Sequence, residues 1–209
     1  MGLSCEQLRE SKSKPKISDI SLLLLSDYYE KYLMPFIYTY KITTKNDNVR
    51  YIKLRFDSFR FCHLLGIESI VKANVNREEI SQYKGENGWN NIKSESITIN
   101  SLRKINKGKY KSKKDKMVFF YLIPRIIDNP RGVIYSKEKV SENNTIECKI
   151  LFYDEFEKAY VHLGIDKDND GIYYPRTFFI ERVTDKSDGK KYINNQDEIK
   201  VVIENRGNL

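Results

Sequence analysis

Two histidines offer the most versatile chemistry in this 209-residue sequence, His63 and His162, because imidazole exchanges protons near neutral pH. His63 lies within the apolar segment Phe59–Leu65, where it suits either a general acid or base or a hydrogen-bonded residue of the core. His162 alternates with Val161 and Leu163 in an expected strand, so it faces solvent if these two residues face the core. We therefore take His63 as the candidate for proton transfer.

A second candidate segment begins at Tyr173. Pro175 cannot donate to a strand ladder, so the chain is expected to be an edge strand or to bulge there, and bulges re-aim side chains near active sites. Arg176 follows with a guanidinium that can bind phosphate oxygens, and Thr177 with a hydroxyl donor. Tyr173 and Tyr174 offer aromatic faces on which a base can stack. An aromatic edge strand with an ordinary surface arginine explains the same residues without a function.

The positive charge of the chain is concentrated in one run of 14 residues, Arg103 to Lys116, which holds eight basic residues and one acid. This run has a net charge of +7, whereas the whole chain has +8. Such a run suits a polyanion, because each neutralised phosphate releases a counterion, although a solvated loop has the same composition. The residues predicted to contact RNA here are Lys104, Lys107, Lys109, Lys111, Lys113 and Lys114.

Metal and cofactor motifs are weak or missing. Asp166–Gly171 matches the first half of a calcium loop, but the twelfth position is Thr177 where a glutamate is needed, so a charged hairpin turn is the better interpretation. No phosphate-binding loop is present, and we expect no cofactor and no metal. The cysteines are scattered without a CxxC pair, which predicts a reducing cytoplasm and no structural zinc: Cys5, Cys62 and Cys148.

The composition predicts a folded cytoplasmic protein. Hydrophobic residues make up 40% and aromatic residues 12% of the chain, enough to exclude global disorder. The longest purely apolar runs have four residues, far short of the roughly 20 that cross a membrane, and the first residues lack the apolar stretch of a signal peptide. We expect no membrane partner.

The elements that position these residues change character along the chain. Residues 1–16 are expected to form a mobile tail, residues 84–96 a loop and residues 103–116 a flexible basic loop. Predicted elements of the first half are a helix over 18–33, a hairpin of strands 36–44 and 49–56, a helix from 58 to 65 and a helix over 99–105. Predicted strands of the second half cover 133–136, 145–153, 158–166, 172–183 and 198–204. This order predicts an α+β fold, with an antiparallel sheet (a C-terminal meander plus the N-terminal hairpin) backed by helices, in a single domain over residues 17–206.

Three short segments resemble a known family. Phe61–Ile67 resembles the F-x-H-L-L-G-hydrophobic motif of a phage-associated nuclease-like family in the barnase–EndoU–colicin–RelE (BECR) group. Tyr174–Phe179 is similar to that family's Y-x-P-[ST]-F-F-like element, and Tyr192–Gln196 looks like its ending. The resemblance covers roughly residues 20–204.

The resemblance implies a BECR or RelE-like α+β fold and metal-independent cleavage of RNA, in which the 2′-hydroxyl attacks the adjacent phosphate to leave a cyclic phosphate. By position, His63 becomes the acid or base and Thr177 the hydroxyl that orients phosphate, while Arg176 is the charge stabiliser by its chemistry alone. The second acid or base stays open among Tyr135, Lys149 and Glu181.

Two functions stay open at this point. One is an endoribonuclease of phage or mobile-element origin that acts as a toxin or counter-defence factor, with RNA as substrate and an antitoxin as a candidate partner. The other is an inactive RNA- or protein-binding module of the same fold that inhibits a host nuclease or defence complex. The small number of candidate catalytic residues favours the second function, because RNA cleavage uses two proton-transfer groups and the sequence offers only one clear candidate.

Overall fold

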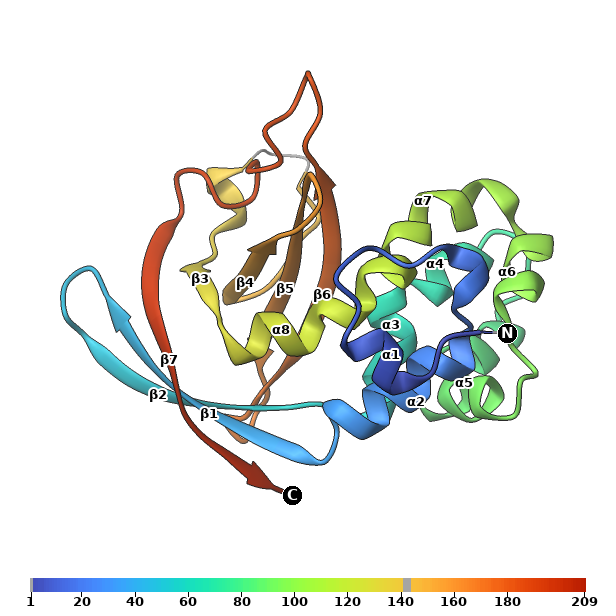
Figure 1. Cartoon of the computed structure of the whole chain (residues 1–209), viewed down its shortest axis with the longest axis horizontal. Helices are drawn as coiled ribbons and strands as arrows, with labels where there is room; N and C mark the ends of the chain where they lie inside the picture. The colour runs from blue at the N-terminus through green and yellow to red at the C-terminus, as the bar shows by residue number, and fades with distance from the viewer. Residues whose placement is uncertain (1, 141–143) are drawn as a thin grey trace. The chain divides into compact units, whose positions relative to one another are not determined.

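In a computed structural model, which describes residues 2–140 and 144–209, the chain divides into two compact units (Figure 1). The helical unit combines the chain up to Met34 with Asp57–Tyr121, and the barrel unit combines Pro35–Phe56 with Leu122–Leu209. Each unit is therefore built from two separate stretches of the sequence. The single domain expected over residues 17–206 stays a prediction. Residues 141–143, which belong to an expected turn, lie outside the described residues.

Short helices make up the helical unit. They are α1 Cys5–Arg9, η1 Ile17–Asp19, α2 Leu22–Tyr32, η2 Ser58–Arg60, α3 Phe61–Leu65, α4 Ile67–Val71, η3 Glu79–Tyr83, α5 Gly85–Lys93, α6 Ile99–Ile105 and α7 Lys107–Phe119, after which η4 spans Phe120–Leu122. Helix α1 lies in the segment expected to be a mobile tail, and its Leu8 is fully buried. Helix α2 begins later than predicted, because the hydroxyl of Ser21 accepts a hydrogen bond from the Leu24 amide and caps it.

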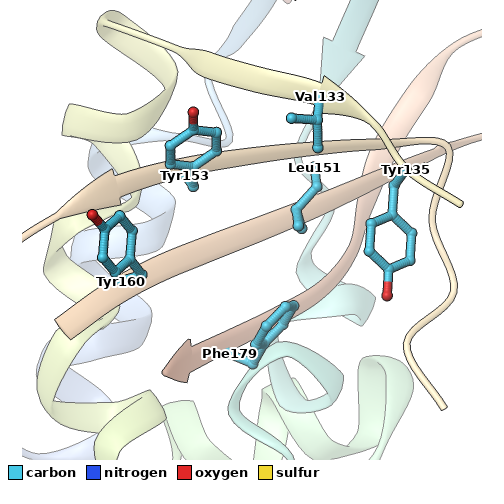
Figure 2. Packing of buried hydrophobic residues seen from close by; sticks show 6 residues of the cluster. All are labelled: Val133, Tyr135, Leu151, Tyr153, Tyr160 and Phe179. Atoms are coloured by element: carbon cyan, nitrogen blue, oxygen red, sulfur yellow. The ribbon is translucent and has the colours of Figure 1, made fainter. Parts of the chain in front are cut away.

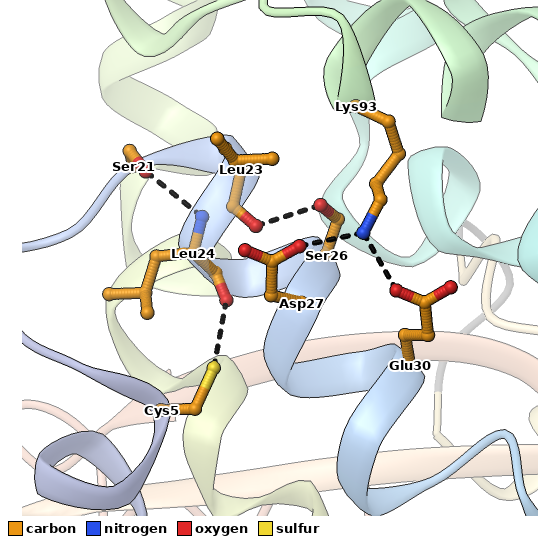
Figure 3. Close-up of polar contacts among 8 residues, drawn as sticks. All are labelled: Cys5, Ser21, Leu23, Leu24, Ser26, Asp27, Glu30 and Lys93. Atoms are coloured by element: carbon orange, nitrogen blue, oxygen red, sulfur yellow. Dashed lines mark hydrogen bonds and ion pairs between the residues drawn. The ribbon is translucent and has the colours of Figure 1, made fainter.

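Polar contacts join α2 to α5 (Figure 3). The Lys93 ammonium lies 2.6 Å from Asp27 Oδ1 and 2.7 Å from Glu30 Oε2. Residues 84–96 were expected to form a loop because of their glycines, and that prediction was wrong for most of the segment. Gly88 is required by packing, since a Cβ atom there would lie 2.8 Å from the sulfur of Cys62 in α3, so this glycine lets α5 approach α3 closely.

The basic run is also helical, not a flexible loop. Thr98 caps α6 through a capping box, and Asn106 caps α7 by accepting a hydrogen bond from the Lys109 amide at 3.0 Å. Tyr110 and Met117 of α7 are buried. Their spacing of seven residues is two helical turns, so they place one face of α7 against the rest of the unit.

Within the described residues, seven strands close into a barrel in the order β1-β2-β6-β5-β4-β3-β7. Their bounds are β1 Phe36–Thr44, β2 Val49–Arg55, β3 Arg131–Ile134, β4 Ile150–Glu155, β5 Ala159–Lys167, β6 Tyr173–Arg182 and β7 Asp197–Asn208; the helices α8 Ile123–Asp128 and η5 Lys137–Lys139 belong to the same unit. The predicted open antiparallel sheet backed by helices is therefore wrong. Strand β7 pairs with both β1 and β3, and the pairing of β2 with β6 is parallel, which makes the barrel mixed.

Aromatic side chains fill the interior of the barrel. Tyr38 and Tyr40, two residues apart on β1, are fully buried. The ring of Tyr40 lies 5.5 Å from that of Phe152 on β4, a strand that does not neighbour β1. The Tyr40 hydroxyl donates to the carbonyl of Ile127 in α8 at 2.8 Å, so its polar end is satisfied inside the core.

The strands β4, β5 and β6 are buried on their outer face as well (Figure 2). The cluster there consists of Val133, Tyr135, Leu151, Tyr153, Tyr160 and Phe179. The later segment 183–193 packs against it through Val183, Tyr192 and Ile193. His162 belongs to this face and is fully buried, with its ring stacked 4.5 Å from that of Phe179. The prediction that His162 faces solvent is wrong because a second layer covers the strand.

Candidate functional site

His63 is exposed on α3, whereas its neighbours Cys62 and Leu64 are fully buried. The helix ends at Gly66, which adopts the left-handed conformation (φ 70°) that glycine accepts without strain. The apolar residues around His63 therefore anchor the helix and hold the imidazole outward. Its exposure disagrees with the interpretation of His63 as a sealed core residue and leaves the acid or base interpretation standing.

Basic residues of α7 lie against the turn that carries His63. The Lys116 ammonium donates to the Leu64 carbonyl at 3.3 Å, and a Cβ atom on Gly66 would lie 3.3 Å from the Cδ atom of Lys113. Burial, with a smaller contribution from the neighbouring Lys113 charge, lowers the pKa of Lys116 to about 8. The helical unit thus combines an exposed imidazole with two cationic side chains at one short helix.

The lysines of α7 form two ridges, one on each side of the buried stripe of Tyr110 and Met117. Ridge A consists of Lys107, Lys111 and Lys114, and ridge B of Lys109, Lys113 and Lys116; both follow a spacing of four and then three residues, which keeps side chains on one side of a helix. Ridge B is the one that contacts α3. Lys116 was not among the predicted site residues, although its spacing of three residues from Lys113 indicated that the two share one side of a helix.

The predicted bulge near Pro175 is confirmed in the barrel unit. Gly164 of β5 pairs with Thr177 while Ile165 pairs with Pro175, so Arg176 is the extra residue on β6. Its guanidinium lies 3.2 Å from Glu147 Oε2 and donates to the Tyr174 hydroxyl at 3.3 Å. A phosphate bound by Arg176 would have to compete with the Glu147 carboxylate.

The other predicted residues of β6 differ in exposure. The exposed fraction of Tyr173 is only 6%, and the residue pairs with Leu54 of β2. Its ring is therefore not available for stacking on a base. Tyr174 and Thr177 are partly exposed. The methyl group of Thr177 lies against Gly164, where a Cβ atom would come within 2.6 Å of it. Roles for Arg176 and Thr177 in phosphate binding stay predictions.

A hollow of about 350 Å³ lies beside this bulge. It is lined by Tyr135, Ser136, Lys137, Glu138, Ile146, Glu147, Cys148, Lys149 and Asp166. Its charges compensate one another, since Lys149 lies 3.8 Å from Asp166 and Lys137 lies 3.8 Å from Glu147. Burial raises the pKa of Cys148 to about 12, which keeps it a thiol and removes it as a nucleophile near neutral pH.

The open candidates for a second acid or base are all in the barrel unit. Burial raises the pKa of Tyr135 to about 12 and raises the pKa of Glu181 above its ordinary value, while Lys149 forms the ion pair just described. His63 and the basic helix lie in the helical unit, and Arg176 and Thr177 in the barrel unit. Within the residues the structure describes, no three His, Cys, Asp or Glu side chains gather as metal ligands.

A comparison with protein families finds a match over most of the chain. A family model described as "phage-Barnase-EndoU-ColicinE5/D-RelE like nuclease4" (PBECR4) matches residues 25–209. No curated protein and no solved structure matches the chain. Among the described residues, no helix is long and apolar enough to cross a membrane.

Proposed function

The chain belongs to the PBECR4 family of BECR-type nucleases, and from that premise we propose that it is a metal-independent endoribonuclease that uses His63 for proton transfer. The observation that carries the proposal is the exposure of His63 on α3, a short helix that Lys116 contacts at Leu64 and Lys113 approaches at Gly66. An imidazole that reaches solvent next to fixed positive charge suits catalysis on a phosphodiester.

The proposed reaction needs three contributions. A base takes the proton of the 2′-hydroxyl as its oxygen attacks the adjacent phosphorus, an acid protonates the departing 5′-oxygen, and cations stabilise the charge on the phosphorane. The products are a 2′,3′-cyclic phosphate and a 5′-hydroxyl end. His63 supplies one proton-transfer role, and Lys113 with Lys116 supplies positive charge near it. Thr177 is proposed as a further phosphate contact on the strength of the family motif, and Arg176 on the strength of its guanidinium chemistry and its position in the bulge.

The biological role proposed with this activity is that of a toxin or counter-defence factor of phage or mobile-element origin that acts on RNA in the cytoplasm. The word "phage" in the family description supports the origin. A free ribonuclease arrests growth when it is expressed, so induction of the wild-type chain is expected to stop growth and induction of His63→Ala is not. Rescue by one co-expressed protein would identify an antitoxin.

Cleavage itself is tested with purified protein, total RNA and EDTA, followed by mapping of the product ends. We expect 2′,3′-cyclic phosphate ends with the wild type and a loss of at least 100-fold in rate with His63→Ala, which is the lower range for a general acid or base. Lys72→Ala is the matched control, since Lys72 is an exposed residue at the end of α4 and its loss should leave the rate unchanged. Equal cleavage by His63→Ala and wild type would reject the proposal.

A further inference from the structure

A second hollow, of about 250 Å³, lies entirely in the helical unit between η1 and one flank of the basic helices. It is lined by Ile17, Arg103, Lys107, Tyr110, Lys111 and Lys114. Four of these six residues are cations and none is acidic. Three of the cations are the members of ridge A, the side of α7 that does not contact the turn of His63.

The charges of this hollow are not neutralised within the described part of the chain. Arg103 and the three lysines of ridge A form no ion pair there. The lysines of the barrel hollow, in contrast, are paired with Glu147 and Asp166. Like charges gathered in one place repel one another, so a bound anion would stabilise this arrangement.

The dimensions point to part of a polymer and not to a small molecule. A volume of about 250 Å³ is below the roughly 300–1,000 Å³ of pockets that enclose a whole drug-sized ligand. Ridge A extends over eight residues of α7, from Lys107 to Lys114, and these two residues are about 10 Å apart along the helix axis. Ile17 and the largely buried Tyr110 add apolar walls beside the cations, so the contacts to a phosphate backbone would come from the four cations.

We propose that this hollow binds the phosphate backbone of single-stranded RNA and holds the substrate at a distance from the reacting bond. This proposal rests on the proposed function. It assigns ridge B to the turn that carries His63 and ridge A to a separate contact with the RNA backbone. Loss of ridge A should therefore weaken RNA binding and raise KM with little change in kcat.

The test measures binding without cleavage. The probe is a short 2′-O-methyl oligouridylate, which lacks a free 2′-hydroxyl and cannot undergo the proposed reaction, and its affinity is followed by fluorescence anisotropy over a series of KCl concentrations. Removing three phosphate contacts from a single strand reduces the slope of log K against log salt by about 2, and this reduction is expected for Lys107→Gln/Lys111→Gln/Lys114→Gln.

The matched control removes the same charge from exposed positions of the barrel unit, in the triple variant Lys45→Gln/Lys53→Gln/Lys200→Gln, and should keep the wild-type slope. An unchanged slope for the ridge A variant, or an equal reduction in both triple variants, would overturn the inference. If wild-type protein binds the probe through ridge A but cleaves no RNA, the proposed function fails while the binding site stands.

Discussion

His162 is a buried imidazole with an unusual lack of polar partners. Neither ring nitrogen has a hydrogen-bond partner in the described structure, and the ring stacks on Phe179 with Tyr192 at its edge. Burial lowers the pKa of His162 to about 3; backbone groups of Phe179 and Tyr160 oppose this shift but do not reach hydrogen-bond geometry. His162 therefore acts as an aromatic core residue, and not as a reserve for catalysis.

This burial makes stability depend on pH in a predictable direction. His162 has a pKa near 6.5 in the unfolded chain and about 3 in the folded chain. Its contribution to the free energy of unfolding is therefore complete above pH 6.5 and is lost progressively as the pH falls below that value. At pH 5 the loss from this residue is about 2 kcal/mol. We expect His162→Phe to remove that loss, as measured by urea denaturation of both proteins at pH 7 and pH 5.

Other groups near His162 cancel in that comparison. Glu181 lies two residues beyond Phe179 on β6, and burial raises its pKa, but it is present in both proteins. The tyrosines at positions 160 and 192 stay protonated over this range because burial raises the pKa of each. If wild type and His162→Phe lose the same free energy of unfolding between pH 7 and pH 5, the imidazole is not the titrating group.

At the scale of elements, the bulge in β6 depends on a glycine in the neighbouring strand. A Cβ atom at position 164 would lie 2.6 Å from the Thr177 methyl and 2.9 Å from the sulfur of Cys148. Both contacts are too short, and the surrounding strands leave little room for relaxation. Gly164 therefore permits the close approach of β5 to the segment that presents Arg176.

We expect Gly164→Ala to destabilise the protein by about 1–3 kcal/mol, the usual cost of overpacking a buried site, as measured by urea denaturation. The matched control is Gly108→Ala in the first turn of α7, where the nearest atom to a new Cβ is 3.7 Å away. Alanine loses less backbone entropy than glycine in a helix, so this control should be neutral or stabilising by up to about 1 kcal/mol. The same change in stability for both variants would contradict the packing argument.

Local patterns in the sequence were sufficient to predict the elements that are formed by residues close together in the chain. The hairpin β1–β2, the short helix that ends at Gly66 and the bulge at Arg176 follow from alternation, capping and a proline within a strand. Helix α7 was missed because lysine and glycine obscured it, although the spacing of Tyr110 and Met117 was present. Exposure of His63 was undecided, since a helix of five residues is too short to reveal a buried face by periodicity.

Long-range pairing accounts for the features that no local pattern contained. The barrel closes only because β7, at the end of the chain, pairs with β1 near its beginning and with β3. His162 is buried by a segment that follows it by more than 20 residues. Such contacts depend on tertiary packing, which overrides strand alternation when a second layer covers a sheet.

At the scale of the whole molecule, the chain passes between the two units after Met34, Phe56 and Tyr121. Each unit is discontinuous, and the two stretches of the helical unit meet where the Tyr29 hydroxyl donates to the Asp57 carbonyl at 3.1 Å. The residues between those stretches, Pro35–Phe56, are strands of the barrel unit. Unfolding the barrel would leave this connection as a flexible loop that the helical unit must close.

We therefore expect the two units to unfold together. Closing a loop of about 20 residues costs roughly 3 kcal/mol, so loss of the barrel should lower the stability of the helical unit. The single tryptophan, Trp89, is buried in the helical unit and reports it by fluorescence, while amide exchange in β5 reports the barrel. In urea both signals should share one midpoint. A chain that ends after Gln196 lacks β7 and should show a lower Trp89 midpoint, whereas an unchanged midpoint would mean that the helical unit is stable without the barrel.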